Sequence, residues 1–122
     1  MTLEQQVVSL ELAKKLKELG VKQESIWYRR YRKGANPEWD LAYVGNIQAV
    51  DQKCSAFTVA ELGELLPPYF CSFDAKRKYK WSCEKWSHGT INGDVPTQYA
   101  DTEADARARM VIYLVENKLI TL

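Results

Sequence analysis

Apolar residues recur at helical spacing in the first part of the chain and form two stripes there. One stripe consists of Val8, Leu12, Leu16 and Leu19, and the other, nearly opposite, of Leu3, Val7 and Leu10. Thr2 and Gln5 have the spacing of a capping box, and Gly20 suits the end of a helix. The pattern therefore predicts one helix over 2–19. Because one stripe is enough to meet a sheet, the Leu3, Val7 and Leu10 stripe predicts either cover by another part of the chain or a homodimer contact.

Two further stretches have the same spacing. Thr58 and Glu61 repeat the capping-box spacing, and Pro67 and Pro68 end the short helix that follows. Asp101 or Thr102 suits the start of a last helix. The apolar stripe of this last helix is Ala104, Ala108, Val111, Ile112, Val115 and Leu119. Val111 and Val115 lie at its centre, so we expect both in the core.

The segments between these helices are typical of strands that arrive in adjacent pairs. Aromatic and branched residues favour strands at 26–32 and 39–45 with a short third at 47–50, and at 69–73, 79–86 and 95–99, with turns at 33–38 and 88–93. Paired strands between helices predict an α+β fold. We expect one domain over 1–122, an antiparallel sheet of about four to five strands, and three helices packed mainly on one face of it.

Composition narrows the setting of the protein. The 122 residues carry a net charge of +1, so no strong overall field attracts nucleic acid or an anionic membrane. No apolar run approaches the length of a membrane helix, and the N-terminus lacks a signal-peptide pattern. We therefore expect a cytoplasmic protein that does not enter a membrane. Cys54, Cys71 and Cys83 are an odd number without close spacing, which predicts free thiols.

Three segments resemble a group of small proteins encoded in bacteriophages and prophages. They are TLEQQVVSLELAKKLKELGVKQES (2–25), SAFTVAELGELLP (55–67) and ADTEADARARMVIYLVENKLI (100–120), about half of the chain. The two paired-strand segments, 26–54 and 68–99, carry no such resemblance. The group has no assigned activity and no catalytic residues to transfer. The resemblance implies only a protein that works in the cytoplasm of an infected bacterium.

Patterns of catalytic and metal-binding residues are weak. Cys71, Cys83 and His88 lack the close ligand pair of structural zinc sites, and a fourth ligand would have to be Cys54 or a carboxylate. His88, the only histidine, follows Cys83 in a glycine-flanked turn without a helix start that would activate the thiol. Glycine-rich phosphate-binding motifs are absent from the sequence. We therefore predict a protein without enzymatic activity, cofactor or metal.

Basic and aromatic residues are concentrated together in IWYRRYRK (26–33) and again in DAKRKYKWSCEKW (74–86). Cations beside aromatic rings suit an acidic protein surface, and they also suit single-stranded nucleic acid. The candidate binding residues are Trp27, Arg29, Tyr31, Lys33, Arg77, Lys78 and Lys80. The alternative is that the start of the strand enters the core and the arginines reach solvent along buried stems.

Together these observations predict an accessory protein that binds a host or phage macromolecule through the open face of its sheet. Because the chain is nearly neutral, a protein partner is favoured. The phage setting makes an inhibitor of host defence one version of this role. The alternative from another class is a single-stranded nucleic-acid-binding protein.

Overall fold

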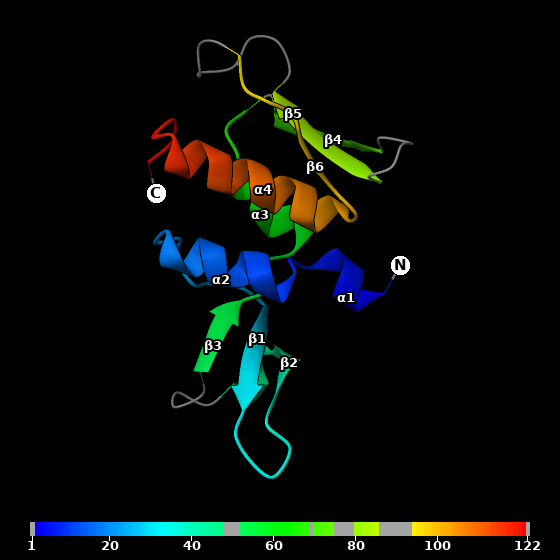
Figure 1. Ribbon diagram of the computed structural model, residues 1–122, viewed down its shortest axis with the longest axis vertical. Coiled ribbons are helices and arrows are strands. Elements are labelled where there is room, and N and C mark those ends of the chain that lie inside the picture. The colour runs from blue at the N-terminus through cyan, green and yellow to red at the C-terminus, as the bar shows by residue number, and fades with distance from the viewer. Residues whose placement is uncertain (1, 48–51, 69, 75–79, 86–93, 122) are drawn as a thin grey trace.

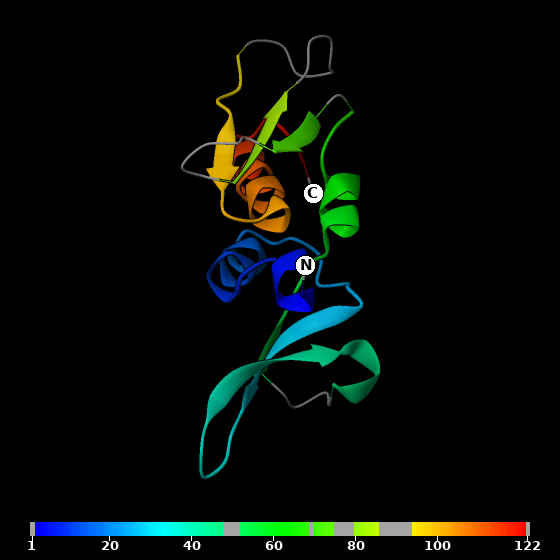
Figure 2. The ribbon, with the colours of Figure 1, turned by 90° about the vertical axis from the view of Figure 1, so that its right-hand side faces the viewer.

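The chain folds into a layer of helices that lies between two small antiparallel sheets (Figures 1 and 2). The computed structural model describes residues 2–47, 52–68, 70–74, 80–85 and 94–121. The elements are α1 (Leu3–Gln6), α2 (Leu10–Glu18), β1 (Trp27–Arg32), β2 (Glu38–Tyr43), the 3-10 helix η1 (Val44–Asn46), β3 (Gln52–Ser55), α3 (Val59–Leu65), β4 (Phe70–Asp74), β5 (Trp81–Lys85), β6 (Gln98–Ala100) and α4 (Glu103–Glu116).

The predicted α+β class is confirmed, but the predicted single sheet is wrong. One sheet has the order β2-β1-β3 and the other the order β4-β5-β6, and all neighbouring strands are antiparallel. The helices lie between the sheets and do not cover one common face (Figure 2). Among the described residues, the two paired-strand segments share no hydrogen-bonded edge, because the helical layer separates them. The alternation of apolar and polar residues along a strand predicts which side chains share a face. It carries no information about which other strands lie beside that strand.

The predicted helix over 2–19 is broken after its first turn. Val7 is extended, forms a bridge with Thr58, and is 1% exposed. The Val8 N–H donates to the Phe57 carbonyl at 2.9 Å, and the Ser9 N–H donates to Oδ1 of Asp105 at 2.8 Å. These partners, remote in sequence, replace the local hydrogen bonds that a continuous helix needs. The exposed stripe of Leu3, Val7 and Leu10 therefore does not form, and the homodimer prediction loses its surface.

The end of α2 agrees with the prediction. Gly20 has a φ of 88°. Its N–H donates to the Lys17 carbonyl, and the Val21 N–H donates to the Leu16 carbonyl, each at 3.1 Å. This pair of bonds is a Schellman motif, which needs the left-handed conformation that glycine adopts without strain.

The helices α3 and α4 begin at the predicted caps. The Glu61 N–H donates to Oγ1 of Thr58 at 3.2 Å, and the Thr58 N–H donates to the Glu61 carboxylate at 2.8 Å. Oγ1 of Thr102 accepts from the Asp105 N–H at 3.1 Å. Both helices thus start where the sequence places a residue that satisfies free backbone donors.

The helix α4 is buried on more sides than its predicted stripe. It contacts β4, β5 and β6 on one side and α1, α2 and α3 on the other. Met110 and Leu114 are therefore buried with Val111, whereas Val115 is only half-buried and Leu119 is exposed. Expectation and structure agree at Val111 and differ at Val115, because α4 lies between two layers.

The remaining strands differ slightly from their predicted bounds. The third strand lies at Gln52–Ser55 rather than 47–50, of which 48–50 are outside the described residues. The strand predicted at 95–99 is Gln98–Ala100. The turn predicted at 88–93 also lies outside the described residues.

Candidate functional site

The strand β1 carries the first half of the predicted binding surface, and its central cation is buried. Arg29 faces the helical layer and is 7% exposed. Its Nε and Nη2 donate to the Val8 carbonyl at 3.2 and 2.9 Å, and its Nη1 pairs with the Glu4 carboxylate. The expectation that Arg29 presents its charge to solvent is wrong. Its guanidinium holds the break between α1 and α2.

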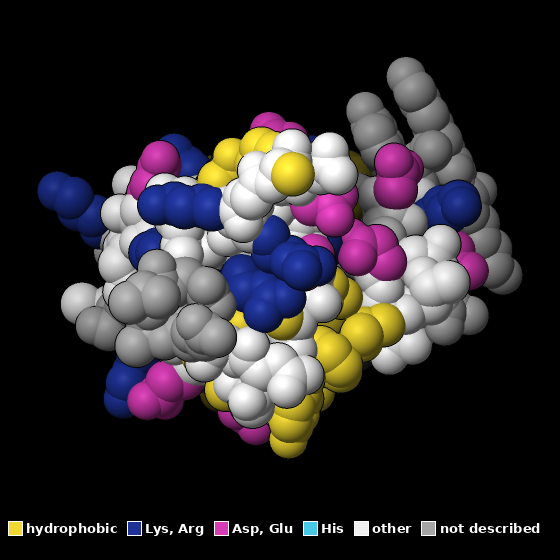
Figure 3. Space-filling view, turned by 90° about the horizontal axis from the view of Figure 1, so that it is seen from below, with side chains coloured by type: hydrophobic (Ala, Val, Ile, Leu, Met, Phe, Trp, Pro, Cys, Tyr) yellow, Lys and Arg dark blue, Asp and Glu magenta, His cyan; other side chains and the backbone are white. Residues whose placement is uncertain are grey.

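The opposite face of β1 has arginines with acidic partners. Arg30 makes two hydrogen bonds to Asp40, at 3.1 and 2.9 Å, and Arg32 lies 3.7 Å from the same carboxylate. The Arg30 guanidinium holds the pKa of Asp40 below its ordinary value. Seen from the end of the molecule that carries this sheet, basic side chains border acidic ones directly (Figure 3). The two guanidinium groups share this one carboxylate, so it neutralises only part of their charge.

Aromatic rings of this sheet are engaged in contacts within the chain. Trp27 meets Tyr43 edge to face, with ring centroids 5.7 Å apart. Tyr31 lies against Trp39 at 5.5 Å, and Nζ of Lys14 lies 4.7 Å above the Trp39 ring. Trp27 and Tyr31, both predicted binding residues, are half-buried.

The second half of the predicted surface lies elsewhere. Lys80 is exposed just before β5, in the sheet at the other end of the molecule (Figure 1). Arg77 and Lys78 are outside the described residues. Lys33 is exposed beyond the end of β1. The helical layer stands between Lys33 and Lys80, so the expected single face made of both segments does not form.

A groove of about 470 Å³ lies where α2 crosses the edge of the β2-β1-β3 sheet. We call it the lysine groove; it is lined by Lys14, Lys17, Glu18, Trp39, Gln52, Lys53 and Cys54. Lys14 and Lys17 come from the α2 wall. Nζ of Lys17 donates to the Lys53 carbonyl at 2.7 Å. Lys53 pairs with Arg30 across the strands, so its side chain lies on the opposite face of the sheet, where its ammonium is 5.1 Å from the Tyr28 ring centroid.

The thiol at the floor of the lysine groove, that of Cys54, is unreactive. Cys54 is buried, and burial raises the pKa of its thiol even though the ammonium groups of Lys17 and Lys14 act in the other direction. Burial also raises the pKa of Cys83 to about 12. Thiols that stay protonated are poor nucleophiles. All three cysteines are free.

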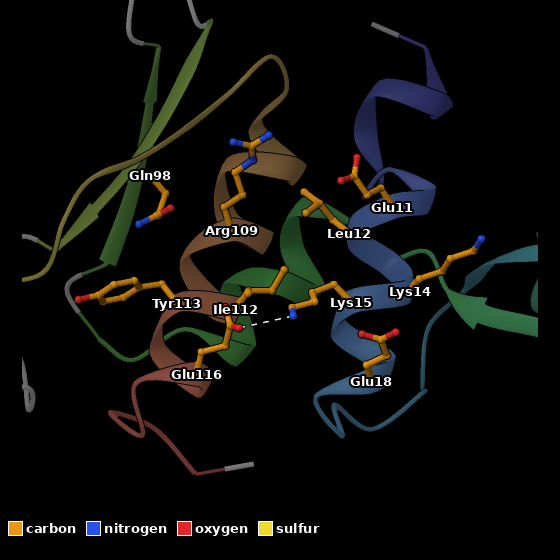
Figure 4. A pocket seen from close by; sticks show the side chains of 10 residues that line it. All are labelled: Glu11, Leu12, Lys14, Lys15, Glu18, Gln98, Arg109, Ile112, Tyr113 and Glu116. Atoms are coloured by element: carbon orange, nitrogen blue, oxygen red, sulfur yellow. Dashed lines mark ion pairs between the residues drawn. The ribbon is translucent and has the colours of Figure 1, made fainter.

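A second groove, of about 500 Å³, lies on the other side of α2, between it and α4 (Figure 4). Leu12 and Ile112 form its apolar part, and Lys15 pairs with Glu116 across it at 3.5 Å. Acidic and basic side chains are equal in number around it, and Lys14 points away from it (Figure 4). Its charges balance, so it selects no charged ligand.

Sequence reasoning missed the lysine groove. Lys14 and Lys17 lie on the polar side of an amphipathic helix, where lysines are usual, and no strand was predicted at Lys53. Trp39 was assigned to a strand, but only the packing of α2 on the sheet brings Lys14 over its ring. The i, i+3 spacing of Lys14 and Lys17 was the one available signal.

Within the described ranges, no group of three or more His, Cys, Asp or Glu side chains is placed to hold a metal ion. The same part of the chain contains no helix with the length and apolar character that crossing a bilayer requires. His88 lies outside it. No family model matches the chain, and comparisons with curated proteins and with solved structures likewise give no match.

Proposed function

We propose that this protein is a non-enzymatic accessory protein of a bacteriophage or prophage, and that it binds a host or phage macromolecule in the lysine groove. One observation carries the proposal. Among the described residues, the arginines of β1 have acidic partners, whereas Lys14 and Lys17 take part in none of the ion pairs. These lysines meet at one groove beside an indole ring.

The phage setting rests on the resemblance of segments 2–25, 55–67 and 100–120 to small phage and prophage proteins. Those segments form α1, α2, α3 and α4, the helical layer that carries one wall of the groove. A protein of this kind acts in the bacterial cytoplasm during infection. Inhibition of a host defence protein is the version of the role that this setting favours.

Binding of single-stranded nucleic acid is the second candidate. The observation that favours it is the placement of the Lys14 ammonium group over the Trp39 ring, since such proteins combine cations with aromatic rings. Both candidates use the same groove and differ in the ligand.

The test is a pull-down from phage-infected host lysate, with and without nuclease, using three forms of the protein. The Lys14→Glu/Lys17→Glu variant reverses two charges in the groove. The matched control, Lys22→Glu/Lys33→Glu, makes the same change at exposed lysines outside it. We expect the groove variant to lose the captured macromolecule and the control to retain it. Equal capture by all three forms would contradict the proposal.

A further inference from the structure

We infer that the ligand of the lysine groove is an acidic polypeptide segment, held through its Asp and Glu side chains. This inference rests on the proposed function and names the class of partner. Three features carry it: the charge of the groove, the state of its aromatic rings, and the capped edge of β3.

The charge of the groove favours a carboxylate-bearing ligand. Two lysines whose ammonium groups are on the groove side of the sheet, Lys14 and Lys17, and one acidic residue, Glu18, line it, whereas the Lys53 ammonium lies on the opposite face over Tyr28. Lys14 and Lys17 are exposed, so their ammonium groups can turn toward a ligand without unfolding the helix. Lysine is a compact charge on a flexible stem, and it pairs with carboxylates that differ in position. A chain with several Asp or Glu residues therefore complements this surface.

The aromatic rings disfavour nucleic acid. A base needs an open ring face on which to stack. Trp39, the aromatic residue that lines the groove, has Lys14 over its ring and Tyr31 against it. The groove presents the ammonium groups of Lys14 and Lys17, whereas a nucleic-acid site presents cations along the length of a phosphate backbone.

The edge of β3 shows how the segment binds. An exposed edge strand invites another strand to pair with it. Here the Lys53 carbonyl accepts from Nζ of Lys17, and the Ser55 N–H donates to Oε1 of Gln23 at 2.7 Å. These side chains occupy backbone groups that an added strand would use. The acidic segment is therefore recognised by its charges, and its sequence is only loosely constrained.

The experiment is a titration of the ¹⁵N-labelled protein with a short oligoglutamate peptide, followed by NMR. The expected result is saturable shifts of the Trp39 indole N–H and of the Lys14 and Lys17 amides. Loss of one exposed ion pair costs up to about 1 kcal/mol, or about fivefold in Kd. We therefore expect Lys14→Gln/Lys17→Gln to weaken binding by about fivefold to about thirtyfold, and Lys22→Gln/Lys33→Gln to leave it unchanged.

Parallel titration with oligothymidylate separates this inference from the proposed function. If the oligonucleotide shifts the same signals at lower concentration than the peptide, the acidic-segment inference is wrong. The proposal that the groove binds a macromolecule then still stands. The same conclusion follows if the peptide does not shift these signals while the lysate capture still depends on Lys14 and Lys17. If neither ligand binds and the Lys14→Glu/Lys17→Glu variant captures the same macromolecule from lysate as wild type, both proposals fail.

Discussion

At the scale of single residues, buried charges in this protein act as structural connectors. Arg29 is the clearest case, because its guanidinium satisfies the Val8 carbonyl where the chain leaves α1 and also pairs with Glu4. A charged group buried in this way is retained only while its partners are present.

Arg29→Ala should destabilise the fold, whereas Arg32→Ala should not. Removal of the Arg29 side chain leaves the Val8 carbonyl without its donor, at a cost of about 1–3 kcal/mol. Arg32 is exposed, and its loss should change the free energy of unfolding by less than about 0.5 kcal/mol. Urea denaturation of both variants measures the difference. Equal midpoints would show that the guanidinium does not support the α1–α2 break.

Asp40 gives the protein a specific acid sensitivity. Because the Arg30 hydrogen bond holds its folded pKa below the ordinary aspartate value of about 3.9, its contribution is complete above that value. The contribution is lost as the pH falls through the lower, folded pKa. The stability difference between wild type and Asp40→Asn should therefore be constant at neutral pH and shrink below about pH 4. A difference that grows on acidification would show that the pKa is raised instead.

At the scale of elements, the Arg107 side chain of α4 packs closely against Gly63 of α3 and joins the two helices. A Cβ atom at Gly63 would clash with Nη1 of Arg107. Arg107 donates to the Val59 carbonyl and to Oγ of Ser72, each at 3.0 Å, and it lies 3.6 Å from Glu103. The glycine therefore makes room for a side chain that holds α3, β4 and α4 together.

Gly63→Ala should lack the stabilisation that alanine normally gives in a helix. The usual gain is about 0.8–1.0 kcal/mol, but here the methyl group displaces the Arg107 guanidinium from its hydrogen bonds. In an Arg107→Ala background, the same substitution should recover that gain. A double-mutant cycle from urea denaturation tests the coupling. Additive effects would show that Arg107 accommodates the methyl group freely.

The ends of the helices were more predictable from sequence than the contacts between elements. The caps at Thr58 and Thr102 and the end at Gly20 depend on local hydrogen bonds, so the sequence was sufficient for them. The break after α1 depends on Phe57 and Asp105, which are distant in sequence. The lysine groove depends in the same way on how α2 lies on the sheet. Local patterns contain neither contact.

At the scale of the whole molecule, one core connects the two sheets. Cys54 of β3 and Cys83 of β5 belong to the same buried cluster as Leu16, Val111 and other side chains of the helical layer. A shared core predicts that the two ends of the molecule open together.

Thiol labelling tests this cooperativity, because a buried cysteine is at each end. In native buffer, Cys54 and Cys83 should be labelled at the same slow rate, and Cys71, which is half-buried, should be labelled first. Mass spectrometry of the digested protein identifies each site. Much faster labelling of Cys83 than of Cys54 would show that the β4-β5-β6 sheet opens on its own.

The central claim is that the lysine groove selects acidic polypeptide by charge, and a charge-swap measurement of Kd tests it most directly. Wild type, Lys14→Glu/Lys17→Glu and the control Lys22→Glu/Lys33→Glu are each titrated with labelled oligoglutamate and oligolysine, and the fold of each variant is checked by circular dichroism. We predict that wild type and the control prefer oligoglutamate, and that the groove variant prefers oligolysine. A control that loses its preference as fully as the groove variant, or a groove variant that keeps the wild-type preference, would contradict the account.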